Sequence, residues 1–221
     1  MGELCIFAEC MGKTDAFIIK LSKALEGTLP GPESQFKMAP RLRLENNNGL
    51  FRNAAVLVLL YRKEEKWQFV LMKRPEYPGH HSNQVSLPGG IFEEGDPDLG
   101  ATALRETREE IGIDDSPILI LGKLSKLHIP VSGIEVSPYV GYYPENPVFK
   151  PDPAEVSYLI EVPLSDLLSP ETAKDDIRTI LCKPVRVPYF NIAGEQVWGA
   201  TAMILSEFID VVRSLEGAGL Q

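Results

Sequence analysis

Residues 85–113 read VSLPGGIFEEGDPDLGATALRETREEIGI, and this stretch decides what the rest of the chain must support. It opens with a proline and two glycines, Pro88 to Gly90, which favour a sharp turn at the end of a strand. An acidic loop follows, and then apolar residues recur at helical spacing. The pattern predicts a strand, a glycine turn and a helix over Leu99–Ile111.

Three glutamates share one side of this expected helix. At about 100° per residue, Glu110 lies about 40° to one side of Glu106 and Glu109 about 60° to the other, so their carboxylates span about 100°. A stripe expected to be buried lies next to this arc. The stripe comprises Gly100, Ala103, Leu104, Thr107 and Ile111. The carboxylates are therefore expected at the edge of the core, where a cleft would form.

Carboxylates that lie so close together raise one another's pKa unless a cation is present. A site made only of carboxylate oxygens suits a hard cation, Mg²⁺ or Mn²⁺. The backbone N–H groups of Gly89 and Gly90 would be free to approach an anion. The alternative is a solvated helix face on which Arg105 and Glu109 form an ordinary i,i+4 ion pair.

Length and charge restrict the class of protein. The 221 residues are 44% apolar and 24% charged, which is typical of a globular domain, expected to span 1–221. The chain has 22 Lys and Arg against 31 Asp and Glu, a net charge of −9. We therefore expect no binding of nucleic acid or of an anionic membrane. An anionic substrate would need a local reversal of this charge.

The location of the protein also follows from the sequence. No stretch approaches the roughly 18 consecutive apolar residues of a membrane span, and the first residues lack the pattern of a secretory signal. Cys5, Cys10 and Cys182 show no Cys-x-x-Cys spacing, which argues against a zinc finger or a disulfide scaffold. A cytoplasmic protein is expected.

The remaining elements are expected to alternate irregularly. Residues 13–27 predict an amphipathic helix capped by Thr14 or Asp15, and residues 28–49 a long connection. Strands are expected at 54–61, 67–73, 118–124, 136–143, 155–162 and 179–187, and a last helix at 199–215. This order favours an α/β or α+β sandwich, a mixed sheet between helices with the first strand central. Residues 1–50 would wrap a catalytic core of residues 51–221.

Residues 89–113 resemble the Nudix box, the signature of hydrolases that cleave a nucleoside diphosphate linked to another group. Arg105, Glu106, Glu109 and Glu110 fall on the second half of the box without a gap. The resemblance implies the Nudix fold, with Mg²⁺ or Mn²⁺ held by the three glutamates. Glu109 would also polarise the attacking water, and Arg105 would hold the carboxylates in place.

The first half of the box departs from the general form, because Gly90 and Arg105 are one residue further apart. Counting forward from Gly90 puts the loop acid at Asp96, whereas counting back from Arg105 puts it at Pro97. The roles of Asp96 and Asp98 therefore stay open. The longer loop is itself a feature of the coenzyme A pyrophosphatase-like branch.

Other stretches are similar to that branch. They are residues 29–43, 71–90, 155–168 and 197–205. The resemblance implies hydrolysis of coenzyme A or acyl-coenzyme A to 3′,5′-ADP and 4′-phosphopantetheine or its acyl form. It implies substrate contacts from Arg74, His81, Gln84, Gly89 and Gly90. Glu155, which follows Pro153 at an expected strand start, would be an extra metal ligand or base, with a plain surface carboxylate as the alternative.

Two residues depart from the coenzyme A signature. Gly79 stands where the branch has a second arginine, and Asn83 stands where it has a glycine. A hydrolase of ADP-ribose or NADH therefore remains a rival, as does a Nudix-fold binding module without catalysis. The partner in each case is a small nucleoside diphosphate derivative, and the chain is expected to be a monomer or a homodimer.

Overall fold

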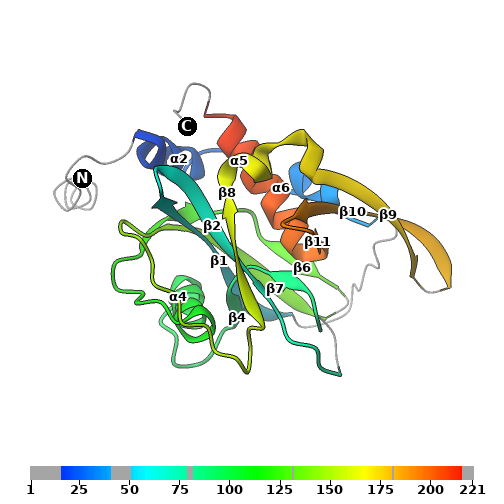
Figure 1. The fold of residues 1–221 in the computed structure, drawn as a ribbon, viewed down its shortest axis with the longest axis horizontal. Helices are drawn as coiled ribbons and strands as arrows, with labels where there is room; N and C mark the ends of the chain where they lie inside the picture. Colours follow the sequence, from blue (N-terminus) through cyan, green and yellow to red (C-terminus); the bar gives the residue numbers. More distant parts are fainter. Residues whose placement is uncertain (1–15, 41–50, 79–81, 131, 181, 216–221) are drawn as a thin grey trace.

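The computed structural model describes residues 16–40, 51–78, 82–130, 132–180 and 182–215. An eight-stranded mixed sheet surrounds β1, Arg52–Lys63 (Figure 1). Strand β1 pairs in parallel with β7, Ile134–Tyr142, and antiparallel with β2, Lys66–Lys73, and β4, Gly89–Ile91. The other strands are β3 (Val85–Ser86), β5 (Leu119–Lys123), β6 (Leu127–Ile129) and β8 (Tyr158–Pro163). The expectation of a central first strand is confirmed.

The apolar run of β1 is continuous because both faces of the strand are covered. Leu57 and Leu59 belong to one buried cluster, whereas Val58 and Leu60 belong to a second cluster on the opposite face. A strand buried on both sides loses the alternation of apolar and polar residues that a half-exposed strand shows. The sheet must therefore lie between two layers.

Helices form those two layers. Helix α4, Leu99–Ile111, packs against β1 and β4 on one face. Helices α2 (Ala16–Leu25), α5 (Leu164–Leu168) and α6 (Gly199–Arg213) contribute buried residues to the cluster on the other face (Figure 1). The predicted α+β sandwich is confirmed. None of the helices in the described part of the chain is long and apolar enough to cross a membrane.

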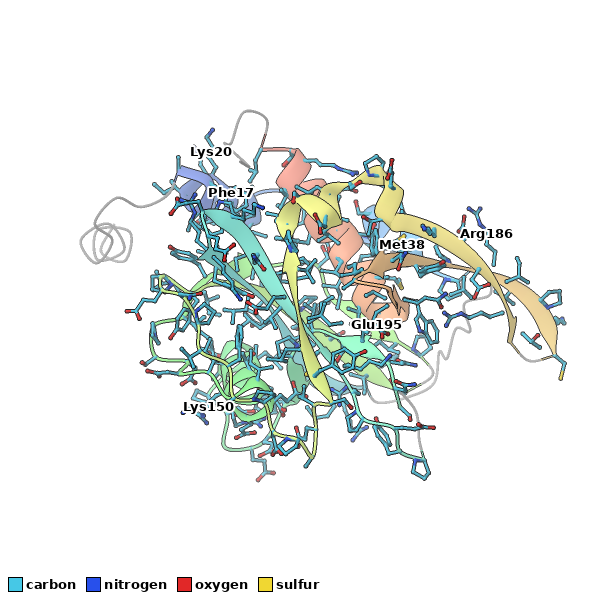
Figure 2. The ribbon with its side chains drawn as sticks, in the orientation of Figure 1. Phe17, Lys20, Met38, Lys150, Arg186 and Glu195 are labelled. Atoms are coloured by element: carbon cyan, nitrogen blue, oxygen red, sulfur yellow. The ribbon has the colours of Figure 1, made fainter. Side chains whose placement is uncertain are left out.

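A second sheet was not anticipated. It comprises β9 (Ala173–Ile180), β10 (Lys183–Ile192) and β11 (Glu195–Trp198), all antiparallel. The single strand expected at 179–187 is wrong, because this stretch contains the turn between β9 and β10. The hairpin projects from the body, with Arg186 labelled on it (Figures 1 and 2). Strand β9 is charged and largely exposed, whereas β10 carries two prolines and buries Val185, Val187, Phe190 and Ile192.

Two other expected elements have different bounds. The helix expected over residues 13–27 is described over Ala16–Leu25 and ends two residues early, and its expected caps Thr14 and Asp15 lie outside the described residues. The strand expected from residue 155 begins at Tyr158, because Glu155 lies in a turn in which its N–H donates to the Asp152 carbonyl. The two-residue turn between β1 and β2 consists of Glu64 and Glu65, which both adopt positive φ.

The connection expected over residues 28–49 contains structure. Its described part forms α3, Pro32–Gln35, and the 3₁₀ helix Phe36–Met38. Gln35 donates to the carboxylate of Glu207 on α6 at 2.9 Å, and the Gly31 N–H donates to the same group at 3.0 Å. Glu207 is fully buried and also accepts from the Ser125 N–H. One internal carboxylate thus ties the N-terminal segment to the sandwich.

We predict that Glu207→Ala lowers the free energy of unfolding by about 3 kcal/mol, since two buried donors and the part-buried Ser125 N–H lose their acceptor. Urea denaturation followed by circular dichroism measures the change. Glu171→Ala, at an exposed position of the 3₁₀ helix Pro170–Thr172, is the matched control and is expected to change stability by less than about 0.5 kcal/mol. Equal stability of the two variants would contradict a role for Glu207 as an anchor.

Candidate active site

Helix α4 has a defined cap at each end. The Asp98 carboxylate accepts a hydrogen bond from the Ala101 N–H at 2.8 Å and caps the N-terminus. Gly112 ends the helix at φ 63°, where a side chain would be strained and a Cβ would lie 1.9 Å from the Lys150 carbonyl oxygen. The expected helix, Leu99–Ile111, is confirmed at both ends. An aspartate directly before the first helical residue is the sequence signal for this cap.

The two glycines before the helix make room for the glutamates. Gly89 adopts φ +145°, and a Cβ there would lie 2.2 Å from the Ala55 carbonyl oxygen. A Cβ on Gly90 would lie 2.4 Å from the carboxyl carbon of Glu106. Any side chain at either position would displace β1 or the carboxylate. The glycine pair therefore allows β4 to approach α4 closely.

Glu110 is the most buried of the three glutamates, at 2% exposure. Its carboxylate accepts a hydrogen bond from the Gly89 N–H at 2.7 Å and lies 3.3 Å from the Arg74 guanidinium. The anion that the Gly89 N–H contacts is thus Glu110 itself. Burial raises the pKa of Glu110 to about 8, although Arg74 and the Gly89 N–H act in the opposite direction.

Arg105 is held by a loop acid. Its Nε and Nη2 donate to the two carboxylate oxygens of Asp96 at 2.8 and 3.0 Å. Asp96 also accepts from the Thr102 hydroxyl and from the Glu93 N–H. These hydrogen bonds, with that from Arg105 the strongest, hold the pKa of Asp96 well below its usual range. A paired fork of this kind orients a guanidinium.

This contact shows how the longer loop is accommodated. Asp96 is buried and grips Arg105, whereas Asp98 caps the helix. Pro97 separates the two acids, so the extra residue falls after Asp96. Counting along the sequence left two positions for the loop acid, and the structure selects the one counted from Gly90.

Arg105 in turn contacts two of the glutamates. Its Nη1 donates to Glu106 at 2.9 Å and to Glu109 at 3.1 Å. Glu109 is half-exposed, whereas Glu106 is largely buried. Burial raises the pKa of Glu106, and the nearby charges of Glu109 and Glu155 raise it further. Glu155 also raises the pKa of Glu110, so this exposed side chain lies in the field of the same acidic group.

The loop after β2 lies beside this group. The Arg74 N–H donates to the Gln84 carbonyl at 2.9 Å, which closes the loop that joins β2 to β3. Asn83 has φ 55°, a left-handed conformation that asparagine tolerates better than most residues after glycine. The replacement of glycine at this position therefore preserves the turn. Gly79 and His81 lie outside the described residues.

The donor set suits a hard divalent cation. Glu106, Glu109 and Glu110 offer only oxygen ligands. Burial and the neighbouring carboxylates raise the pKa of Glu106 and of Glu110. A bound cation would stabilise the ionised carboxylates and lower these pKa values. Within the described residues, however, no three acidic, histidine or cysteine side chains converge to hold a metal ion as they stand. Glu106 and Glu109 face Arg105, and Glu110 faces Arg74, so binding an ion requires the carboxylates to turn from these arginines.

We predict that the metal-free protein loses stability as the pH rises from about 5 to about 8. In this window the unfolded Glu110 carboxyl is ionised, while the folded one, with a pKa of about 8, keeps its proton. Glu110→Gln removes this difference and is expected to exceed the wild type in free energy of unfolding by about 2–4 kcal/mol above pH 8. Urea denaturation in EDTA at about pH 5 and about pH 9 measures the change. Parallel pH profiles for both proteins would contradict the assignment.

Comparison with known proteins identifies the family to which this chain belongs. A family model described as the NUDIX domain matches residues 51–187. The Nudix hydrolase NudL of Photorhabdus laumondii is 34% identical over 174 residues, which cover 79% of this chain and 90% of that protein. Nudix hydrolase 15, mitochondrial, of Arabidopsis thaliana is 34% identical over 161 residues, 70% of this chain and 56% of that protein.

Solved structures include a Nudix hydrolase from M. smegmatis, RenU, with a TM-score of 0.48 and 14% sequence identity over 78% of this chain and 95% of that one. The family model spans the strand β1, the glycine turn and the whole of α4. The chain therefore belongs to the Nudix hydrolase family, enzymes that hydrolyse pyrophosphate bonds.

Proposed function

We propose that this enzyme hydrolyses the diphosphate of coenzyme A or acyl-coenzyme A with Mg²⁺ or Mn²⁺, releasing 3′,5′-ADP and 4′-phosphopantetheine or its acyl form. The observation that carries the reaction type is the set of three glutamates on α4, one of them buried against the Gly89 N–H. The choice of substrate rests on the similarity of residues 71–90 to the coenzyme A branch. The left-handed conformation of Asn83 supports it, because the one departure that falls on described residues keeps the turn.

The reaction assigns a task to each charged group. A bound Mg²⁺ would neutralise the diphosphate and lower the pKa of the attacking water. Glu106 and Glu110 would hold the ion, and Glu109, the most exposed of the three, would complete the site or accept the proton of the attacking water. Arg105, held by its two hydrogen bonds to Asp96, would keep the glutamates in position. Glu155 would serve as an extra ligand or base.

Substrate contacts are proposed from the loop after β2 and from the glycine turn. Arg74 lies 3.3 Å from Glu110, so its charge is available to a phosphate once Glu110 turns to the metal ion. The Gln84 carbonyl accepts from the Arg74 N–H and so lies beside Arg74, and His81 belongs to the same loop in sequence. Gly89 and Gly90 would offer their backbone to the substrate only where Glu110 and Glu106, which now lie against them, turn aside. A cytoplasmic location remains a prediction from the sequence.

Two rivals remain. Because Gly79 replaces an arginine of the coenzyme A signature, a related dinucleotide such as ADP-ribose or NADH is the alternative substrate. A binding module without catalysis is the alternative class of protein. Such a module would be free to lose the box acids, whereas Glu106, Glu109 and Glu110 are all present beside an oriented Arg105.

We predict that Asp96→Asn lowers kcat by roughly tenfold or more. The neutral asparagine side chain cannot accept both hydrogen bonds by which the Asp96 carboxylate holds the Arg105 guanidinium. Asp98→Asn is the matched control, since asparagine caps a helix as well as aspartate does, and its kcat is expected to stay within about twofold. Steady-state kinetics with a saturating divalent metal compare the two. Equal losses in both variants would mean that the loop acts through overall charge.

Product analysis tests the substrate. The purified protein with Mg²⁺ is offered coenzyme A, ADP-ribose and NADH at equal concentration, and products are separated by chromatography and identified by mass. Release of 4′-phosphopantetheine from coenzyme A is expected, with a loss of roughly a hundredfold or more in Glu109→Gln and Glu110→Gln. Preference for another dinucleotide would overturn the substrate, and turnover of none of them would favour the binding module.

A further inference from the structure

The connection between β7 and β8, residues 143–157, is attached to the C-terminal end of α4. The Lys150 N–H donates to the Ile111 carbonyl and the Asp152 N–H donates to the Glu110 carbonyl, each at 3.0 Å. Carbonyls in the last turn of a helix lack a partner within the helix, and these two hydrogen bonds supply one to each. Lys150 accordingly lies beside α4 (Figures 1 and 2). The connection therefore borders the helix that carries the three glutamates.

Two apolar side chains anchor this connection on either side of Asp152. Phe149 packs against the buried cluster on the α4 face of the sheet, and Val156, at 2% exposure, belongs to that cluster. Between these anchors, Pro151 and Pro153 flank Asp152. A proline fixes its own φ and restricts the residue before it to extended conformations. The backbone from Phe149 to Val156 therefore has few alternative conformations.

Asp152 closes a tight turn within this segment. Its carboxylate accepts a hydrogen bond from the Ala154 N–H at 2.8 Å. Its carbonyl accepts from the Glu155 N–H at 3.1 Å and from the Val156 N–H at 2.8 Å. An aspartate that bonds the backbone two residues further on fixes the turn that follows it. Asp152 thus sets the backbone position of Glu155, whose side chain is exposed.

The position of Glu155 beside other acids is unfavourable for its charge. Glu155 lies close enough to Glu106 and Glu110 for its charge to raise the pKa of both. In the described part of the chain, no cation or hydrogen-bond donor pairs with its carboxylate. Repulsion by the other carboxylates favours an outward movement of such a side chain. Its place beside the acids therefore depends on the backbone that carries it.

We propose that Asp152 is a positioning residue of the active site, which holds Glu155 beside the carboxylates of Glu106 and Glu110. There Glu155 adds its negative charge to the site for a divalent cation. The carboxylate of Asp152 is engaged by the Ala154 N–H, so Asp152 acts through Glu155 and is not itself a ligand. This inference rests on the proposed role of Glu155 as an extra ligand or base, and it does not depend on which diphosphate is the substrate.

A double-mutant cycle with two readouts tests the proposal. Mn²⁺ binding to the substrate-free protein is measured by isothermal titration calorimetry, and kcat and KM are measured with coenzyme A and Mg²⁺. Glu155→Gln is expected to weaken Mn²⁺ binding about threefold or more and to lower kcat about tenfold or more. Asp152→Ala is expected to change both quantities in the same direction by about threefold or more, with KM within about twofold. In the Glu155→Gln protein, Asp152→Ala is expected to change either quantity by less than about twofold, because Glu155 no longer carries a charge.

Matched variants separate the turn from the charge. Asp152→Asn keeps an oxygen acceptor for the Ala154 N–H and is expected to stay within about twofold of the wild type in both measurements. Asp114 makes the same kind of turn, because its carboxylate accepts from the Ser116 N–H two residues further on. Asp114→Ala is therefore the control for the loss of a turn and a charge elsewhere, and is expected to change neither quantity. Circular dichroism checks that each variant keeps the fold, as the exposed position of Asp152 predicts.

Three results would overturn the role of Asp152. They are additive losses in the double variant, an Asp152→Asn protein as impaired as Asp152→Ala, and an Asp152→Ala protein that matches the wild type. A Glu155→Gln protein that matches the wild type would overturn the role of Glu155 as well, while a loss of turnover in Glu110→Gln would leave the hydrolase reaction standing. If the wild type leaves coenzyme A intact, the proposed substrate fails, and Mn²⁺ binding alone decides the role of Asp152.

Discussion

The buried carboxylate of Glu110 constrains much of the surrounding structure. At 2% exposure an ionised carboxylate is costly, and burial raises the pKa of Glu110 to about 8 because the Gly89 N–H and the Arg74 guanidinium offset only part of that cost. Gly89 must adopt φ +145° to reach the carboxylate, which brings β4 against β1. Arg74 must leave the end of β2 toward α4. The glycine turn, the central strand and the acidic helix are therefore positioned around the carboxylate of Glu110.

A second carboxylate organises the other half of the site. Asp96 orients Arg105, and Arg105 contacts Glu106 and Glu109. The two assemblies meet on α4, because Glu106 and Glu110 lie one turn apart and their pKa values both respond to Glu155. Arg105 and Arg74 thus contact the three carboxylates that are proposed to hold a divalent cation.

Buried carboxylates recur away from the catalytic face. Glu207 gathers donors from three separate segments and attaches α3 to α6. On the projecting hairpin, Arg178 is held by the Trp198 ring and the Gln196 side chain of β11, and Asp176 lies beside its guanidinium.

The sequence by itself determined the sandwich, the central strand and the helix Leu99–Ile111, because hydrophobic period, glycine turn and cap are local properties. It also determined the three glutamates, whose spacing fixes their common side. Only the tertiary structure decided between Asp96 and Pro97, because that choice depends on which group reaches Arg105 across a loop. The hairpin β9–β10 and the Glu207 anchor also needed the structure. The Glu207 contacts join segments that lie far apart in the chain, and the charged residues of β9 carry no apolar period that the sequence would display.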